Sequence, residues 1–386
     1  MAQVIQTRKT SSVKPARLLP LDALRGAIIV LMALDHANYF IAQQHSPGEY
    51  WGGAFPVYTD AFAFLIRFVT HLAAPGFFFL MGAGMVLFAD ARTGYGWSKW
   101  QVVRHFLLRG LILIALQFVV INRIWEHSPG GWQVRVYVGV LFALGAAMMI
   151  GSLLVWLRPK ILLIITVVLL IGTELLIPQA SLWNEVQYSN LVGYLNPFLI
   201  RTGGTIEIWS NYPVLPWLEL LTFGMFFGYT LLDDPENAYR RGMLVGFAFL
   251  MVFFALRYID GFGNIRSRAG HSWIDYLNVV KYPPSITFTL VTTGINLILL
   301  GALASVRDNR RRYLTPLVVY GRVPLFFYVL HLILYAVLGW LLARNGTSLE
   351  RMLPIWLLGL VVLYPLCLWF GRLKHAQSRN SALRFI

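Results

Sequence analysis

The first apolar segment of the chain holds the residues best suited to chemistry. In its sequence, LDALRGAIIVLMALDHANYF, Arg25 and His36 stand eleven positions apart. Eleven helical steps of about 100° return to within roughly 20° of the start, so both side chains lie on one face, about 16 Å apart along the axis. Asp22 lies one turn before Arg25 on that face and can orient its guanidinium. The pattern predicts an anion held near one membrane surface and imidazole chemistry nearer the other.

Other ionisable residues are expected at the depth of His36. Asp35 precedes it, His71 lies in RFVTHLAAPGFFFLMG, and His331 lies in YGRVPLFFYVLH. Three histidines and a carboxylate suit either zinc or a general base with an orienting partner. A zinc site usually has a tighter pair on one helix, which these residues lack, so we expect no metal. For His71 and His331 alone, a bond to a backbone carbonyl is the competing interpretation. Asp35 points about 100° away from His36, so we expect it to pair with another helix or with a substrate amine.

Three segments expected outside the membrane are longer than simple connections require. They are 43–61, 179–212 and 261–283, and long loops of this kind often carry function. The last two lead into helices that start near NYPVLPW and KYPPS, where proline suits the first turn and free amides carry partial positive charge. Such helix ends favour an anionic group or a developing oxyanion, although the Tyr-Pro pairs could equally be interfacial anchors. The substrate contacts expected here are His45, Tyr212, Trp217, Lys281, Tyr282 and Ser285.

These residues need a set of membrane helices to position them. Apolar runs of about 20 residues are long enough to span a bilayer. Ten such runs fall near 21–42, 62–88, 106–122, 135–157, 161–178, 213–232, 242–260, 284–304, 316–343 and 353–371. With both termini inside, the inner side carries roughly twice as many Lys and Arg residues as the outer side, as the positive-inside rule requires. We therefore predict an all-α polytopic bundle of about ten transmembrane helices, with cytoplasmic basic tails at 1–20 and 372–386 around one domain at 21–371.

The composition excludes most other classes of protein. Apolar residues make up 58% of the 386 residues and charged residues only 13%, about half the share in a soluble protein. The formal net charge of +15 would suit a nucleic-acid binder, but 13 Trp, 26 Phe and so few charges would not. A single cysteine, Cys367, excludes an internal disulfide. A multi-pass protein of the inner cell membrane is the expectation.

These motifs resemble the transmembrane acyltransferase superfamily. The spacing of Arg25 and His36 is similar to that in the first core helix of the acyltransferase-3 branch. A wider resemblance, over residues 17–375, is to bacterial relatives of heparan-α-glucosaminide N-acetyltransferase. It rests on LDALRGAIIVLMALDHANYF, THLAAPGFFFLMGAG, NYPVLPW, KYPPSITF, YGRVPLFFYVLH and YPLCLWFGRLK.

The resemblance implies an enzyme that transfers an acetyl group from cytoplasmic acetyl-CoA to an amine or hydroxyl of a sugar or glycan acceptor at the outer side. The histidine base maps onto His36 by its spacing from Arg25, whereas a looser alignment with the lysosomal enzyme places it nearer His45. We expect the CoA phosphates at Arg25 and Arg322. Acetyl-CoA, the acceptor and membrane lipid are the expected partners, without nucleic acid; a homodimer is left open. The alternative is a solute transporter or lipid flippase that uses the same buried His, Asp and Arg groups.

Overall fold

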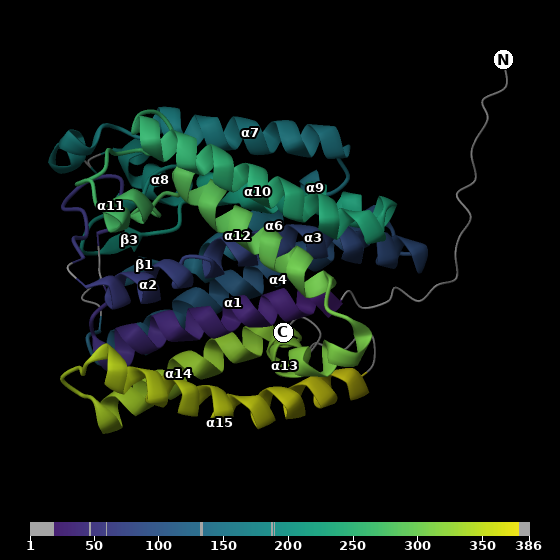
Figure 1. Cartoon of the computed structure of the whole chain (residues 1–386). Helices are drawn as coiled ribbons and strands as arrows, with labels where there is room; N and C mark the ends of the chain where they lie inside the picture. The colour runs from purple at the N-terminus through teal and green to yellow at the C-terminus, as the bar shows by residue number, and fades with distance from the viewer. Residues whose placement is uncertain are drawn as a thin grey trace, which may run out of the picture.

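The molecule is a bundle of long helices, with its strands and most of its short helices at one end (Figure 1). This computed structural model describes residues 19–377 except 46, 47, 59, 132, 133, 187 and 189. Within that part of the chain, eight helical stretches are long and apolar enough to cross a membrane, judged by length and composition. The predicted all-α polytopic bundle is confirmed.

The long elements correspond one to one with the ten expected spans. They are α1 (Leu19–Ala37) with a π-helical turn (Asn38–Ala42), α2 (Ala61–Thr70) with α3 (Ala73–Gly94), α4 (Lys99–Leu116) with a π-helical turn (Gln117–Ile121) and α5 (Asn122–His127), α6 (Val140–Leu154), α7 (Pro159–Leu176), α9 (Val214–Asp233), α10 (Pro235–Ile259), α12 (Ile286–Ala304), α13 (Thr315–Gly321) with α14 (Pro324–Leu342), and α15 (Leu349–Ala376). The shorter ones are β1 (Val136–Val138), a 3-10 turn (Ala180–Glu185), α8 (Leu191–Leu199), β2 (Gly203–Gly204), β3 (Ile208–Ser210), α11 (Trp273–Leu277) and a 3-10 turn (Asp308–Leu314).

Two of the ten long elements differ from an ordinary apolar span. Helix α1 carries three charged residues, Asp22, Arg25 and Asp35, and α6 has only 15 residues. The expected span 135–157 therefore shrinks to α6, because its first residues form strand β1 instead of helix. These two are absent from the eight helices above, yet both line the cavities described below.

Other helix boundaries differ from the predicted ones for local reasons. The span expected at 106–122 belongs to a longer continuous helical stretch, 99–127. The span expected at 316–343 is divided just before Pro324, which has no amide hydrogen to continue a helix. The residues between the spans expected at 213–232 and 242–260 are mostly helix, because the Asp234 carboxylate accepts from the Asn237 amide and Pro235 suits the first turn.

The tails expected at the two ends of the chain lie mostly outside the described residues. Residues 1–18 and 378–386, which hold most of the tails expected at 1–20 and 372–386, lie outside the described residues. Helix α1 already begins at Leu19, and α15 continues to Ala376, so both helices extend into the expected tails. A single domain at 21–371 stays a prediction.

The outer segments pack together into one rim. Strand β3 pairs with β1 in parallel and with β2 in antiparallel orientation. The Glu49 carbonyl accepts from the amides of Lys281 and Tyr282, at 3.1 and 3.0 Å, and the Trp51 amide donates to the Tyr282 carbonyl at 2.9 Å. The first outer loop is thereby fixed to the segment that precedes α12. Helix α1 lies at the centre, in contact with α2, α3, α12, α13, α14 and α15.

Candidate active site

Two cavities enter the bundle and meet beside Asp35 and His36. The first has a volume of about 330 Å³ and the second about 470 Å³. The first extends toward the N-terminal end of α1, where Arg25 lies, and the second toward the loop-rich end, where it is lined by His45 and Tyr50. Five side chains belong to both walls: Asp35, His36, Val140, Tyr212 and Tyr328. Arg25 and His36 thus line one continuous path along α1.

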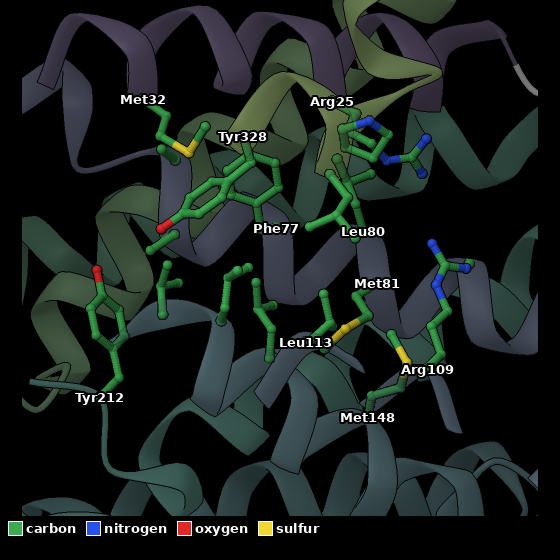
Figure 2. Close-up of a pocket in the computed structure, with 18 of the residues that line it drawn as sticks. Arg25, Met32, Phe77, Leu80, Met81, Arg109, Leu113, Met148, Tyr212 and Tyr328 are labelled. Carbon is green, nitrogen blue, oxygen red and sulfur yellow. The ribbon is translucent and has the colours of Figure 1, made fainter. Parts of the chain in front are cut away.

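Basic side chains line the far end of the first cavity. The Arg25 Nη1 atom donates to Asp22 Oδ1 at 2.9 Å and to the Gly321 carbonyl at 3.1 Å, while Arg322 Nε lies 3.7 Å from Asp22 Oδ2. Arg109 and Lys374 line the same cavity. Figure 2 shows the guanidinium groups of Arg25 and Arg109 at one end of the pocket, on opposite walls. Two cations that face a shared space in this way are suited to an anion.

Close backbone packing sets the position of Arg25. A Cβ atom on Gly26 would lie 1.8 Å from the Leu317 carbonyl oxygen, and one on Gly321 would lie 1.9 Å from the Asp22 carbonyl oxygen. Glycine at both positions lets α1 and α13 touch backbone to backbone, the mode of approach that small residues permit between membrane helices. The same contact brings the Gly321 carbonyl within reach of Arg25.

Between its basic end and His36, the first cavity has an apolar wall. Figure 2 shows Met32, Phe77, Leu80, Met81, Leu113 and Met148 along this stretch, with Tyr212 at the other end. Such a wall suits an extended, largely uncharged chain.

His36 and His331 form a pair across two helices. His36 Nδ1 lies 2.7 Å from His331 Nε2, and the two rings are nearly parallel, with an interplanar angle of 21°. His331 Nδ1 lies 2.9 Å from the Phe327 carbonyl oxygen, and the whole residue is buried. His36 lines both cavities, whereas His331 lies behind it and lines neither.

Arg67 on α2, which the sequence analysis did not identify, organises the other charged groups. Its Nε donates to Glu49 Oε1 at 2.7 Å, and its Nη2 contacts Glu49 Oε2. Its Nη1 donates to Asp35 Oδ1 at 2.5 Å and to His45 Nε2 at 2.8 Å. His71 Nε2 donates to Glu49 Oε1 at 3.0 Å. One guanidinium therefore connects α1, α2 and the first outer loop.

Glu49 lies in that outer loop, and its ionisation follows from its partners. Burial acts to raise the pKa of the Glu49 carboxyl, but Arg67 and His71 beside it hold this pKa well below the usual range. The carboxylate is therefore charged at neutral pH and bonded to two residues. Its function in the structure is to fix Arg67 and His71.

Lys281 lies between the outer loop and the first cavity. It is buried, it lines that cavity together with Asp35 and His36, and its Nζ lies 5.0 Å from the Tyr282 ring centroid. Burial and the neighbouring Arg67 lower the pKa of Lys281 to about 8. Near neutral pH it places an ammonium group in the cavity wall.

Of the residues expected to bind substrate at the starts of α9 and α12, only some line the cavities. Tyr212 and Tyr282, just before α9 and α12, meet with their hydroxyl oxygens 3.3 Å apart and line the cavities. Ser285 instead caps α12 by accepting from the Phe288 amide at 3.1 Å, and it is fully buried. Trp217 is also fully buried among aromatic rings. Neither lines either cavity, because both side chains serve the packing of their helices.

The four residues expected to meet at one level divide into two groups. His36 pairs with His331, whereas Asp35 turns to Arg67 and His71 turns to Glu49. His71 and His331 line neither cavity and act through their partners. Within the described part of the chain, no group of three His, Cys, Asp or Glu side chains could hold a metal ion.

Two arginines that line the cavities were not predicted as site residues, although the sequence contains an indication of both. Arg67 and Arg109 each interrupt an apolar helix, and a charge at membrane depth is costly unless it has a partner or a function. Arg67 also precedes His71 by one helical turn. The partners of Arg67, however, come from α1 and from the first outer loop, and could not be assigned from spacing within one segment.

None of the curated proteins compared with the chain matches it. The family model for heparan-alpha-glucosaminide N-acetyltransferase, catalytic, matches residues 17–253. The match includes Arg25, Asp35, His36, Arg67 and Arg109, while Lys281, Arg322 and His331 lie beyond it. Since this match covers more than half of the sequence, the chain belongs to the heparan-α-glucosaminide N-acetyltransferase catalytic family of transmembrane acetyltransferases.

Proposed function

We propose that this protein transfers an acetyl group from acetyl-CoA in the first cavity to an amine or hydroxyl of a sugar or glycan in the second. The observation that supports this most directly is the shared wall: the two cavities reach opposite ends of the bundle and meet at His36. A donor and an acceptor that occupy them come together without either crossing the membrane. His36 then acts as the general base.

The first cavity suits a CoA donor. The excess of Lys and Arg in the loops at the Arg25 end supports a cytoplasmic position for that end. Arg25, Arg109 and Arg322 are available for phosphate groups, which arginine binds in a bidentate manner. The apolar wall beyond them accepts the pantetheine arm, and the three helical turns from Arg25 to His36 span about 16 Å.

The second cavity suits a polar acceptor. It is lined by the aromatic rings of Tyr39, Tyr50 and Tyr282 and by polar groups that include Gln43, Gln117 and Asn211. Aromatic faces pack against sugar rings, while amide groups bond to hydroxyls. Its position at the loop-rich end, opposite the basic end, supports an acceptor that enters from the outer side of the membrane.

The transfer can be written with its atoms balanced. The acceptor nitrogen or oxygen attacks the thioester carbonyl carbon as His36 removes its proton, so that a C–N or C–O bond forms. The tetrahedral intermediate collapses with cleavage of the C–S bond, and His36 returns the proton to the leaving thiolate as CoA-SH. The Lys281 ammonium, which lines the first cavity beside His36, stabilises the oxyanion.

The contacts of His45 favour His36 as the base. An arginine only donates hydrogen bonds, so the lone pair of His45 Nε2 is directed at Arg67 Nη1. His45 Nε2 and Asp35 Oδ1, which lie 3.5 Å apart, both accept from Arg67 Nη1, and His45 lines the acceptor cavity. The same experiment tests both candidates for the base, His36 and His45.

The test uses the full chain in proteoliposomes with acetyl-labelled acetyl-CoA on one side and glucosamine on the other. We expect acetyl transfer that requires both substrates and depends on which side holds the CoA. His36→Ala should lose transfer but still bind CoA, while His45→Ala should keep measurable turnover. Unchanged turnover in His36→Ala would refute the base assignment. Glucosamine uptake without CoA, and no acetylated product, would support the transporter instead.

A further inference from the structure

The pair formed by His36 and His331 has a defined order of hydrogen bonds. His331 Nδ1 lies 2.9 Å from the Phe327 carbonyl oxygen, and a carbonyl can only accept. The hydrogen of His331 is therefore on Nδ1. In a neutral imidazole the other nitrogen then carries a lone pair, so His331 Nε2 is an acceptor.

The order continues into His36. His331 Nε2 lies 2.7 Å from His36 Nδ1, so His36 must donate from Nδ1. In neutral His36 this leaves the lone pair on Nε2, the only ring nitrogen still able to accept a proton. Among the described residues, no side chain or backbone group forms a hydrogen bond with this Nε2, and His36 lines both cavities.

We propose that His331 is a positioning residue that, through the Phe327 carbonyl, holds His36 in the tautomer whose Nε2 is free to take a proton from the acceptor. This inference rests on the proposed function of His36 and extends it to a residue outside the matched family region. The fixing of one ring nitrogen by a partner, so that the other can react, is the arrangement that orients a base in hydrolytic triads. Here a buried neutral imidazole takes the place of a carboxylate.

The surroundings of the pair make the arrangement rigid. His331 is completely buried, with the rings of Phe327 and Tyr335 at centroid distances of 5.2 and 6.1 Å. Tyr328 contacts both imidazoles edge-on, at 6.2 Å from His36 and 5.6 Å from His331. With rings on all these sides, neither imidazole can rotate freely to exchange its hydrogen-bonding nitrogen.

The ionisable neighbours of His36 are the other groups that bear on its tautomer. They are Asp35 on the same helix, Arg67 on α2, His45 in the first outer loop and Lys281 before α12. None of these forms a hydrogen bond with the His36 ring in the described part of the chain. The contact that selects the tautomer is therefore the one with His331.

Two variants separate the hydrogen bond from the packing. His331→Leu keeps a similar volume but removes the acceptor, whereas the Gln side chain of His331→Gln offers a carbonyl oxygen to His36 Nδ1. We expect kcat to fall by at least about tenfold in His331→Leu, and by no more than the 10²–10⁴ that a general base contributes. The KM for acetyl-CoA should be unchanged, and His331→Gln should recover most of kcat. Tyr335→Phe is the control. Tyr335 lies one helical turn after His331 on α14, and its hydroxyl donates to the Trp356 carbonyl at 2.9 Å. The kcat of this variant should match that of the wild type.

Nitrogen NMR of the wild-type protein tests the tautomer without relying on activity or on a variant of His331. Protonated and lone-pair ring nitrogens resonate at well separated shifts, and the His36 signals are assigned by their loss in His36→Gln. We expect a protonated Nδ1 and a lone-pair Nε2 in the wild type, and a mixture in His331→Leu. A proton on Nε2 of wild-type His36, or full kcat in His331→Leu, would overturn the proposal. Should the protein lack transferase activity, the NMR result still decides the tautomer, so this inference and the proposed function fail separately.

Discussion

Gly26 on α1 and Gly321 on α13 allow two helix backbones to lie in direct contact, and a Cβ atom at either site would overlap a carbonyl oxygen of the opposite helix. We expect Gly26→Ala or Gly321→Ala to push these helices apart and to destabilise the protein by about 1–3 kcal/mol, the usual cost of overpacking. The same shift should weaken CoA binding, because Arg25 loses its contact with the Gly321 carbonyl. Thermal unfolding in detergent and CoA titration measure the two effects.

The matched control is Gly172→Ala on α7, where an added Cβ atom would meet no other atom within 4 Å. This variant should unfold at or slightly above the wild-type temperature, because alanine favours helix over glycine. Equal behaviour of Gly26→Ala and Gly172→Ala would contradict the packing argument.

Removal of Arg67 should destabilise the protein strongly. Arg67→Met leaves the carboxylates of Glu49 and Asp35 without their cation, and the loss of one partner from a buried ion pair costs about 3–5 kcal/mol. Adding Glu49→Gln to Arg67→Met should recover part of this loss, since one uncompensated charge disappears. The exposed pair of Arg123 and Glu126 provides the comparison, with 54% and 42% of the two side chains exposed. Arg123→Met should change the stability by no more than about 1 kcal/mol, and an equal loss in both variants would argue against a buried network.

Arg109 should matter for the affinity of the donor and not for the chemical step. We expect Arg109→Ala to raise the KM for acetyl-CoA by about 10–100-fold, corresponding to one hydrogen bond with a charged group at about 1.5–3 kcal/mol. The value of kcat at saturation should change little. Arg104→Ala, on the exposed side of the same helix, is the control and should leave KM unchanged. If both variants raise KM equally, the effect comes from the general positive charge of this surface.

The ionisation of Lys281 should appear in the pH dependence of the reaction. Its pKa of about 8 means that the ammonium loses its charge as the pH rises through that value, so transfer should decline above about pH 8. Lys281→Gln should have low activity near neutrality and lack this decline. A wild-type decline that persists unchanged in Lys281→Gln would assign it to another group.

The same pKa has a consequence for stability with the opposite sign. The unfolded chain retains the Lys281 proton up to its ordinary value of 10.5, whereas the folded protein loses it near 8. Between these values the unfolded state binds more protons, so folding should become more favourable as the pH rises. Lys281→Gln should remove this contribution, which a comparison of unfolding temperatures across that interval would detect.

The sequence predicted the part of the site that lies within one helix. Asp22, Arg25 and His36 share a face because helical periodicity fixes neighbours three, four and eleven residues apart. Their contacts in the structure follow that spacing, including the 2.9 Å bond between Asp22 and Arg25. The number of long elements was predicted equally well, because it depends only on the length of apolar runs.

Contacts between helices could not be predicted in this way. Arg67 binds Asp35 and Glu49, and Arg109 faces Arg25, through the packing of elements that are distant in the chain. For Ser285 and Trp217 the residue types suited a binding site, but helix capping and aromatic packing account for both side chains. Spacing in a sequence does not report which face of a helix is covered by its neighbours.

The meeting of the two cavities also changes the electrical thickness of the membrane at this site. A cavity that admits water or ions carries the potential of its own side inward, so the voltage drop concentrates on the layer around Asp35 and His36 that the cavities share. A full charge that crosses this drop gains or loses about 2.3 kcal/mol per 100 mV. In the proposed reaction, the proton that His36 takes from the acceptor crosses part of this layer, and we therefore expect its equilibrium to depend on the membrane potential.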